Sequence, residues 1–395
     1  MTTQQTEPCI AFVENGSVTI HWYPPDAHPA CHKVQIKRLR HDEFTYGVQY
    51  AEYFEDFKPE DADTIHTHNL PDPQYTDNDV KIGCTYSYWV TFDNGASVGP
   101  ASVKVRDPEV WWPYEKTHAT MTGLVERHGG LVSMKQYGAT VGGSPLEGIV
   151  AGNPEKLIAF VGLIHPGESG PELILPVVER LVASDPELLR RCGVAVLPAV
   201  NRDERERMVR GVPYYMRTNA RGIDLNRNFD GAWEEISYAY GDDTSDPKSS
   251  TYRGAHPESE PETQAVVAFV KENAPKAIVS MHWLASVAGD RFLATKFAAG
   301  DTEYKAMCDP FGALYSKGFR GDDEPAPNGV EYIGSGGSIP SWAYQKLRII
   351  GLDAEHFNDE PGQVCRFDHT HLAYLNEYRD RYYRAVKNVL EATAS

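Results

Sequence analysis

The chain has 395 residues, 41% of them hydrophobic and 24% charged, and a formal net charge of −18 at pH 7. This composition is typical of a globular protein, and the length is enough for two domains that each bury a core. The acidic excess argues against nucleic acid or anionic membranes as partners, and no apolar run is long enough for insertion into a membrane.

The N-terminal stretch and the cysteines bear on the location of the protein. The stretch MTTQQTEPCIAF has neither the basic flank nor the apolar run of a signal peptide, and the six cysteines are scattered without a CxxC pair. We therefore expect reduced cysteines and a cytoplasmic protein. A secreted protein whose leader precedes this sequence is the alternative.

The N-terminal quarter of the chain alternates apolar and polar residues. The stretch GSVTIHWYPP puts Val18, Ile20 and Trp22 on one face, and GCTYSYWV shows the same alternation around Tyr86. This pattern predicts an all-β sandwich. The two stretches resemble the fibronectin type III module, with Tyr86 at the position of its tyrosine corner. We expect residues 1–107 to form this domain and to support the rest of the chain rather than bind a ligand.

From residue 108 onwards the pattern is that of alternating strands and helices. Helical segments near 114–126 and 172–183 occur among the strands LVSMKQYG, EGIVAG, KLIAFVGLI, CGVAVLPAV, KAIVSM and LRIIGLDA. Continuous apolar strands between helices predict an α/β domain over residues 108–395, in which helices cover both faces of a mixed, mainly parallel sheet.

Two further helices are predicted from local signals. Ser259, with Pro261 and Glu262 after it, has the spacing of an N-cap and capping box. The last helix places Leu372 and Leu375 on its apolar face.

Chemically reactive side chains follow four of the predicted strands, and one of these groups is the run from Asn201 towards Arg227. His165 and Glu168 lie in LIHPGESGP, His282 follows KAIVSM, and Glu355 follows LRIIGLDA. Functional residues of such sheets collect at the carboxyl ends of the strands. Two imidazoles and one carboxylate are typical ligands of a catalytic zinc ion, which keeps its fourth coordination position for water. Binding to the metal lowers the pKa of that water from about 15.7 to about 7. A second carboxylate can then act as base. Taken alone, His165 and Glu168 also fit a turn histidine and a helix N-terminal acid.

Six motifs follow one another from about Tyr114 to the end of the chain. In chain order they are HPGE (165–168), MRTNARGIDLNRNF (216–229), SEPETQ (259–264), VSMH (279–282), YIGSGGSI (332–339) and AE (354–355). The region resembles the carboxypeptidase A-like zinc carboxypeptidases, also called funnelins. The resemblance implies one zinc ion per chain bound by His165, Glu168 and His282, with Glu355 as general base and acid.

The resemblance also implies residues that contact the substrate. Arg217 would polarise the scissile carbonyl, Asn226 and Arg227 would hold the free terminal carboxylate, and Tyr332 would close over it. Ile339 would lie at the base of the pocket for the terminal side chain. An apolar floor predicts a preference for apolar or aromatic C-terminal residues, because an unpaired charge buried there costs several kcal/mol.

The predicted function is that of a zinc-dependent exopeptidase that removes the C-terminal residue of peptides or proteins. Gly167 stands where digestive members of the family have an arginine, and HPGES resembles the cytosolic deglutamylases instead. Pro340 and Ser341 lengthen the turn after Ile339 and can turn its side chain away. One alternative is an amidase of the same chemistry that acts on cell-wall peptides or glutamylated tails. Another is a non-catalytic binding or adhesion protein led by the N-terminal domain.

Overall fold

The computed structural model describes residues 9–23, 31–41, 51–70, 72–168, 170–236, 238–239, 242–282, 291–321, 329–355 and 372–395. By their internal contacts these residues form two units. The smaller unit falls within Met1–Trp111 and Arg207–Tyr215, and the larger one takes the rest of the described chain. The predicted domain boundary after residue 107 stays a prediction.

The smaller unit consists of two antiparallel sheets, in the orders β1-β2-β5 and β4-β3-β6-β7. Its strands are β1 (Cys9–Glu14), β2 (Ser17–Trp22), β3 (Lys33–His41), β4 (Asp63–Asn69), β5 (Gln74–Asp77), β6 (Thr85–Phe92) and β7 (Ser97–Lys104). Side chains from both sheets, among them Ile20, Trp22, Ile36 and Tyr88, share one buried cluster. The period of two in the sequence thus corresponds to a β-sandwich core.

Tyr86 lies where the resemblance to a fibronectin type III module places it. Its hydroxyl oxygen accepts a hydrogen bond of 3.0 Å from the backbone nitrogen of Lys81, upstream in the chain. A contact of this kind characterises a tyrosine corner. Membership of the fibronectin type III class stays a prediction.

A segment from much later in the chain completes the smaller unit. Arg207–Tyr215 belongs to it by contacts. The backbone nitrogen of Val13 donates to the carbonyl oxygen of Arg210 at 2.7 Å, and that of Lys104 donates to Gly211 at 2.8 Å. The segment therefore satisfies backbone donors of β1 and β7 that a sandwich edge leaves unpaired.

The larger unit is built on an eight-stranded mixed sheet in the order β16-β15-β17-β14-β10-β11-β9-β8. Its strands are β8 (Val132–Ala139), β9 (Pro145–Gly152), β10 (Leu157–Val161), β11 (Gly193–Leu197), β14 (Ala277–His282), β15 (Arg291–Thr295), β16 (Val330–Gly334) and β17 (Ile350–Glu355). The central pairs β11-β10, β10-β14 and β14-β17 are parallel, whereas β8-β9, β9-β11 and β15-β17 are antiparallel. The predicted fold class is confirmed.

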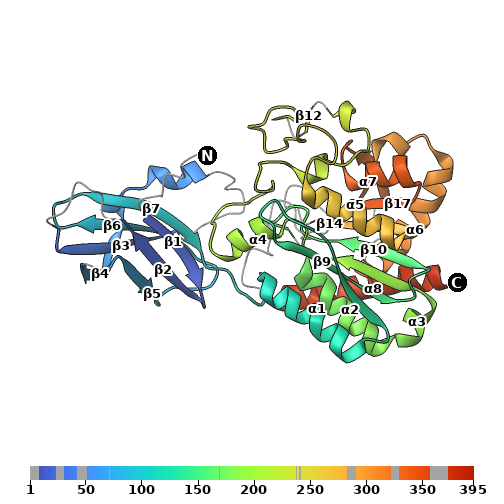
Figure 1. Cartoon of the computed structure of the whole chain (residues 1–395), viewed down its shortest axis with the longest axis horizontal. Coiled ribbons are helices and arrows are strands. Elements are labelled where there is room, and N and C mark those ends of the chain that lie inside the picture. The colour runs from blue at the N-terminus through green and yellow to red at the C-terminus, as the bar shows by residue number, and fades with distance from the viewer. Residues whose placement is uncertain are drawn as a thin grey trace. The chain divides into compact units, whose positions relative to one another are not determined.

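Helices lie on both faces of this sheet, with α5 and α7 on one side and α1, α2 and α8 on the other (Figure 1). The helices are α1 (Tyr114–His128), α2 (Pro171–Ser184), α3 (Pro186–Arg191), α4 (Arg202–Val209), α5 (Pro261–Asn273), α6 (Thr302–Arg320), α7 (Ile339–Trp342) and α8 (Leu372–Ala394). Strand β12 (Tyr238–Ala239) pairs antiparallel with β13 (Asp242–Asp243). Among the described helices, none has both the length and the apolar character needed to span a bilayer.

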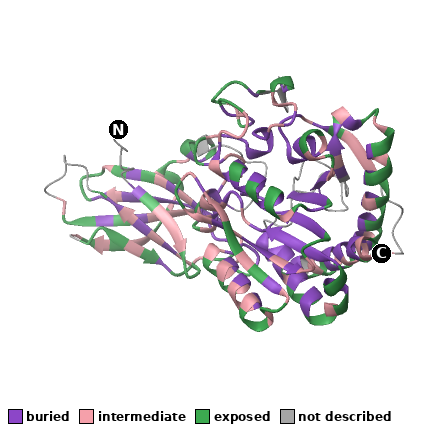
Figure 2. Ribbon diagram, turned by 45° about the vertical axis from the view of Figure 1, so that its right-hand side comes forward, coloured by how far each residue is buried: buried purple, intermediate pink, exposed green. Residues whose placement is uncertain are grey.

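Strand β10 shows why the central strands are continuously apolar. Leu157, Ala159 and Val161 belong to the cluster that packs against α5 and α7, whereas the ring of Phe160 lies 6.5 Å from that of Tyr315 in α6. Each face of the strand is covered, so every position is buried. Figure 2 shows the buried residues of the larger unit gathered along these strands.

Two local predictions are wrong. Helix α5 begins at Pro261 with Glu260 as its N-cap, without a side-chain cap bond, because the Ser259 hydroxyl accepts from Asn228 and donates to Glu260. Leu375 is buried as predicted, but Leu372, in the first turn of α8, is 38% exposed.

Candidate metal centre and active site

Three side chains that the sequence assigns to a metal lie together at the carboxyl end of the central strands. His282 ends β14, and His165 and Glu168 lie in the turn that follows β10. All three are buried, and one potential ligand atom from each lies within 4.8 Å of the others. Glu168 is central: Nδ1 of His165 is 3.0 Å from its Oε1, and Nδ1 of His282 is 2.8 Å from its Oε2.

The outer nitrogen of each imidazole faces a second carboxylate. Nε2 of His165 lies 3.1 Å from Asp224 Oδ1, and Nε2 of His282 lies 3.3 Å from Asp353 Oδ1. A carboxylate at this nitrogen favours the tautomer with the proton on Nε2, which leaves the Nδ1 lone pair for a metal. Two such imidazoles and one carboxylate are a donor set suited to zinc.

Glu355 stands beside the cluster. It ends β17, and the parallel register pairs it with His282. Its Oε2 is buried and has no hydrogen-bond partner among the residues that the structure describes. Burial raises the pKa of Glu355 to about 8, His282 acts against this shift, and Glu168 reinforces it. A carboxyl group with a pKa near neutrality is suited to accepting and returning a proton.

The pKa values of Glu168 and Asp224 are shifted in the opposite direction. Burial acts to raise the pKa of Glu168, but His165 and His282 outweigh it and hold the pKa well below its usual range. Burial is likewise outweighed at Asp224, whose pKa is lowered by Arg217 and Arg227. The ionised form, which a metal or a histidine requires, is thus favoured at both positions.

Arg217 reaches the site through Asp224. Its Nε donates to Asp224 Oδ2 at 2.8 Å, while the other oxygen of Asp224 faces His165. One buried carboxylate therefore orients both a candidate metal ligand and the candidate oxyanion-binding arginine. The side chain of Arg217 is 10% exposed, so this cation lies close to solvent while Asp224 is fully buried.

The structure also brings Asn226, Arg227 and Ile339 together. The amide nitrogen of the Asn226 side chain donates to Asp353 Oδ2 at 3.1 Å, and its Oδ1 accepts from the backbone nitrogen of Ile339 at 3.1 Å. Arg227 donates through Nη1 to the carbonyl oxygen of Asn226. The side chain of Ile339 is fully buried in the core cluster beneath the sheet, so its contact with this group is made by the backbone.

Tyr332 lies apart from the other candidate residues. It belongs to β16 at the edge of the sheet, and its hydroxyl donates to Asp309 Oδ1 in α6 at 2.7 Å. Its ring also lies under the ammonium group of Lys305, which is 4.6 Å from the ring centroid. Its hydroxyl is therefore engaged by α6 rather than by the metal cluster.

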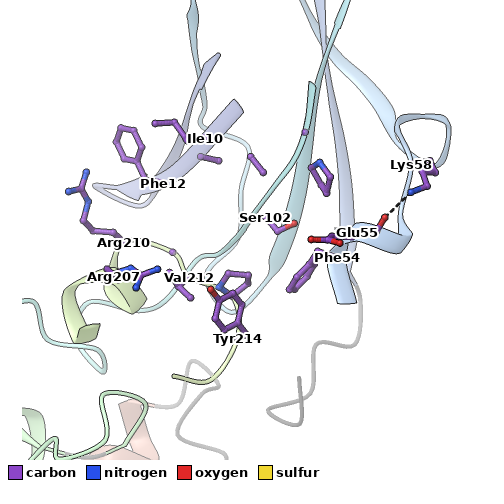
Figure 3. A pocket seen from close by; sticks show the side chains of 16 residues that line it. Ile10, Phe12, Phe54, Glu55, Lys58, Ser102, Arg207, Arg210, Val212 and Tyr214 are labelled. Atoms are coloured by element: carbon purple, nitrogen blue, oxygen red, sulfur yellow. Dashed lines mark hydrogen bonds between the residues drawn. The ribbon is translucent and has the colours of Figure 1, made fainter. Parts of the chain in front are cut away.

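The smaller unit contains a separate hollow of about 850 Å³. Phe12, Phe54 and Tyr214 contribute aromatic walls, and Arg207 and Arg210 lie on one side of it (Figure 3). None of the sixteen lining residues is a candidate metal ligand. The hollow is distinct from the cluster around Glu168.

Comparison with known proteins agrees with this donor set. A sequence profile described as zinc carboxypeptidase matches residues 117–360. The chain belongs to this family. Members of this family use a zinc ion. Among the described residues, the group that could hold it is His165, Glu168 and His282.

Individual members of the family match parts of the chain. Mast cell carboxypeptidase A of Rattus norvegicus is 33% identical over 178 residues, which are 40% of this chain and 42% of that protein. Carboxypeptidase B2 of Homo sapiens is 39% identical over 105 residues, 24% of each chain. These matches span less than half the length of either relative.

Solved structures show the same fold. Carboxypeptidase A from Helicoverpa armigera superposes with a TM-score of 0.59 and 16% identity, over 73% of this chain and 75% of that one. A metallo-carboxypeptidase from Burkholderia cenocepacia covers 96% of this chain and 89% of its own, with a TM-score of 0.50 and 16% identity. At this identity the likeness shows the fold alone, and in the second case it extends into the N-terminal part.

Sequence reasoning missed Asp224 and Asp353, which face the outer nitrogens of the two histidines. Both left a signal. Asp224 lies in the motif GIDLNRNF that supplied Asn226 and Arg227, and Asp353 lies two residues before Glu355 on the same strand. Residues two apart in a strand share a face, so Asp353 could have been placed on the side of the sheet end that carries Glu355.

Proposed function

We propose that this chain is a zinc carboxypeptidase that hydrolyses the C-terminal peptide bond of peptides or proteins. The observation that carries the proposal is the buried cluster of His165, Glu168 and His282, with Glu355 beside His282 at the aligned ends of β14 and β17. The proposal includes a cytoplasmic location, which rests on the sequence alone.

Glu355 is the proton carrier of the proposed reaction. Zinc, when bound, would supply a Lewis acid that polarises the scissile carbonyl group and makes water more acidic. The Glu355 carboxylate takes a proton from the attacking water and returns it to the amine that leaves. Burial and the neighbouring carboxylates raise its pKa to about 8, which makes the carboxylate a stronger base for the first of these transfers.

Arg217 stabilises the negative charge that develops on the carbonyl oxygen. Asp224 fixes its guanidinium before substrate arrives, through the 2.8 Å contact at Nε. A preorganised donor of this kind typically contributes about 3–4 kcal/mol to the transition state. Because Asp224 also faces His165, one side chain orients both this cation and one of the candidate metal ligands.

Asn226 and Arg227 recognise the free carboxylate of the substrate. A guanidinium suits a planar carboxylate because its donors form a rigid fork. Both side chains are buried, and the Arg227 guanidinium donates to the backbone carbonyl oxygen of Asn226. In the proposal Tyr332 closes over this end of the substrate, which requires its hydroxyl to leave Asp309.

Apolar or aromatic C-terminal residues remain the proposed preference. The burial of Ile339 within the core cluster changes how this is tested. An aspartate at position 339 would place a charge among Phe229 and Trp342 and unfold the region, since an unpaired buried charge is costly. The preference is better measured on the wild-type protein with a library of peptides that differ only in the last residue.

Mass spectrometry of paired substrates tests the proposed function. Each peptide is incubated with zinc-loaded protein both as the free acid and as the C-terminal amide, and the Glu355→Gln protein serves as the control. We expect single-residue shortening of the free acid alone, lost in the control and on chelation of zinc. Equal cleavage of the amide would favour the amidase alternative, and cleavage of neither form would favour a binding protein.

A further inference from the structure

A buried arginine contacts the metal-binding turn from helix α4. Arg205 is 2% exposed. Its Nη1 donates to the carbonyl oxygens of Pro166 at 3.0 Å and of Glu168 at 3.2 Å. One guanidinium therefore binds the backbone of the turn at two points, one of which belongs to a candidate zinc ligand.

The same guanidinium also contacts the helix that follows the turn. Its Nη2 lies 3.3 Å from Oε1 of Glu172, in the first turn of α2. Glu172 is fully buried, and the same Oε1 accepts from the backbone nitrogen of Gly170 at 3.1 Å. The two residues thus link α4, the metal-binding turn and the start of α2.

Glu168 is held at both of its ends as a result. Its carboxylate oxygens face the two imidazoles, and its carbonyl oxygen accepts from Arg205. Within the turn, the backbone nitrogen of Glu168 donates to the carbonyl oxygen of His165 at 3.2 Å, and Gly167 has no side chain that could anchor the turn to a neighbouring element. An anchor from outside the turn restricts the positions that the Glu168 carboxylate can take.

We propose that Arg205 and Glu172 form a positioning pair that holds the metal-binding turn in its ligating geometry and so raises the affinity for zinc. Neither residue belongs to the group of candidate zinc ligands. The proposal rests on the zinc site of the proposed function and does not require that the protein cleave peptides.

The test must separate positioning from simple stability. In Arg205→Met the two backbone bonds are lost, and the buried Glu172 carboxylate loses the guanidinium that contacts it, which destabilises the fold. The double variant, Arg205→Met with Glu172→Gln, also removes the negative charge of Glu172, but it still lacks the hydrogen bonds from Arg205 to the backbone of the turn. In Glu172→Gln alone the backbone bonds remain.

Zinc affinity is measured by competition with a chromophoric chelator, and urea unfolding is followed with excess EDTA. We expect the double variant to recover most of the stability lost in Arg205→Met while its zinc affinity stays about 10- to 100-fold below wild type, the usual cost of losing support behind a metal ligand. Glu172→Gln alone should bind zinc less than tenfold more weakly. A double variant with wild-type zinc affinity would overturn the proposal.

Arg106→Met is the matched control. Arg106 is also buried and also donates through Nη1 to two carbonyl oxygens, those of Met208 and Val212. Its loss should change stability but not zinc affinity. If His282→Ala binds zinc as tightly as wild type, the zinc site itself is wrong. If His282→Ala loses zinc while the Arg205 variants keep it, only the positioning pair is wrong.

Discussion

The centre and the edge of the large sheet hold their functional side chains in different ways. At the centre, His165 and His282 each face one carboxylate on either side of the ring, and both are buried. At the edge, Tyr332 is partly exposed and its hydroxyl donates to Asp309 of a neighbouring helix. The side chains at the centre are therefore held in place before any ligand binds, whereas Tyr332 must give up its hydrogen bond to Asp309 before its hydroxyl can contact a substrate. Substitutions at the centre should cost far more than those at the edge.

The largest effect is expected from His282→Ala, which removes a metal ligand. Loss of a residue that only supports a ligand typically costs about 10- to 100-fold in affinity, so loss of the ligand itself should exceed that range. Elemental analysis after dialysis should find about one zinc per wild-type chain and almost none in the variant. Unchanged zinc content would contradict the assignment.

Glu355→Gln should have the next largest effect, on turnover alone. The amide keeps the size of the side chain but cannot accept the proton, and proton transfer by a positioned group contributes about 10²- to 10⁴-fold. Zinc content and thermal stability should stay near wild type. A variant that retains turnover would show that another group is the base.

Asp224→Asn and Asp353→Asn compare the two carboxylates behind the histidines. Asp224 holds both His165 and Arg217, whereas His282 has a second contact, at 2.9 Å, with the hydroxyl of Ser280. We expect zinc affinity to fall about 10- to 100-fold in Asp224→Asn and by less in Asp353→Asn. Chelator competition measures both, and an equal loss would mean that Ser280 gives no support.

The smallest effects are expected at the edge. In Tyr332→Phe the hydroxyl is lost, and one hydrogen bond contributes about 0.5–1.5 kcal/mol, so KM should rise by at most about tenfold with kcat preserved. Asp309→Asn weakens the bond that keeps Tyr332 on α6 and should lower KM slightly. Steady-state kinetics on one peptide gives both values. Identical KM values for wild type and both variants would exclude Tyr332 from substrate binding.

The same contrast explains what the sequence could predict. His282 and Glu355 end apolar strands that pair in register, so their meeting follows from the strand pattern. The contacts of Tyr332 depend on the packing of α6, which no local pattern specifies. The predicted N-cap of α5 was wrong for a similar reason, because the Ser259 hydroxyl accepts a hydrogen bond from Asn228, thirty-one residues earlier. Positions fixed by backbone pairing were predictable, and side-chain partners from distant elements were not.

The segment Arg207–Tyr215 affects the order in which the chain can fold during synthesis. The sandwich strands leave the ribosome first, but Arg106 meets its partners Met208 and Val212 only after another hundred residues have been made. Domains generally fold as units as they emerge. Here the first unit is complete only after residues 112–206 of the second have been synthesised, so a chain that stops before residue 207 should yield a less stable sandwich. A gene fusion that exchanges residues 1–111 alone would separate the unit from Arg207–Tyr215.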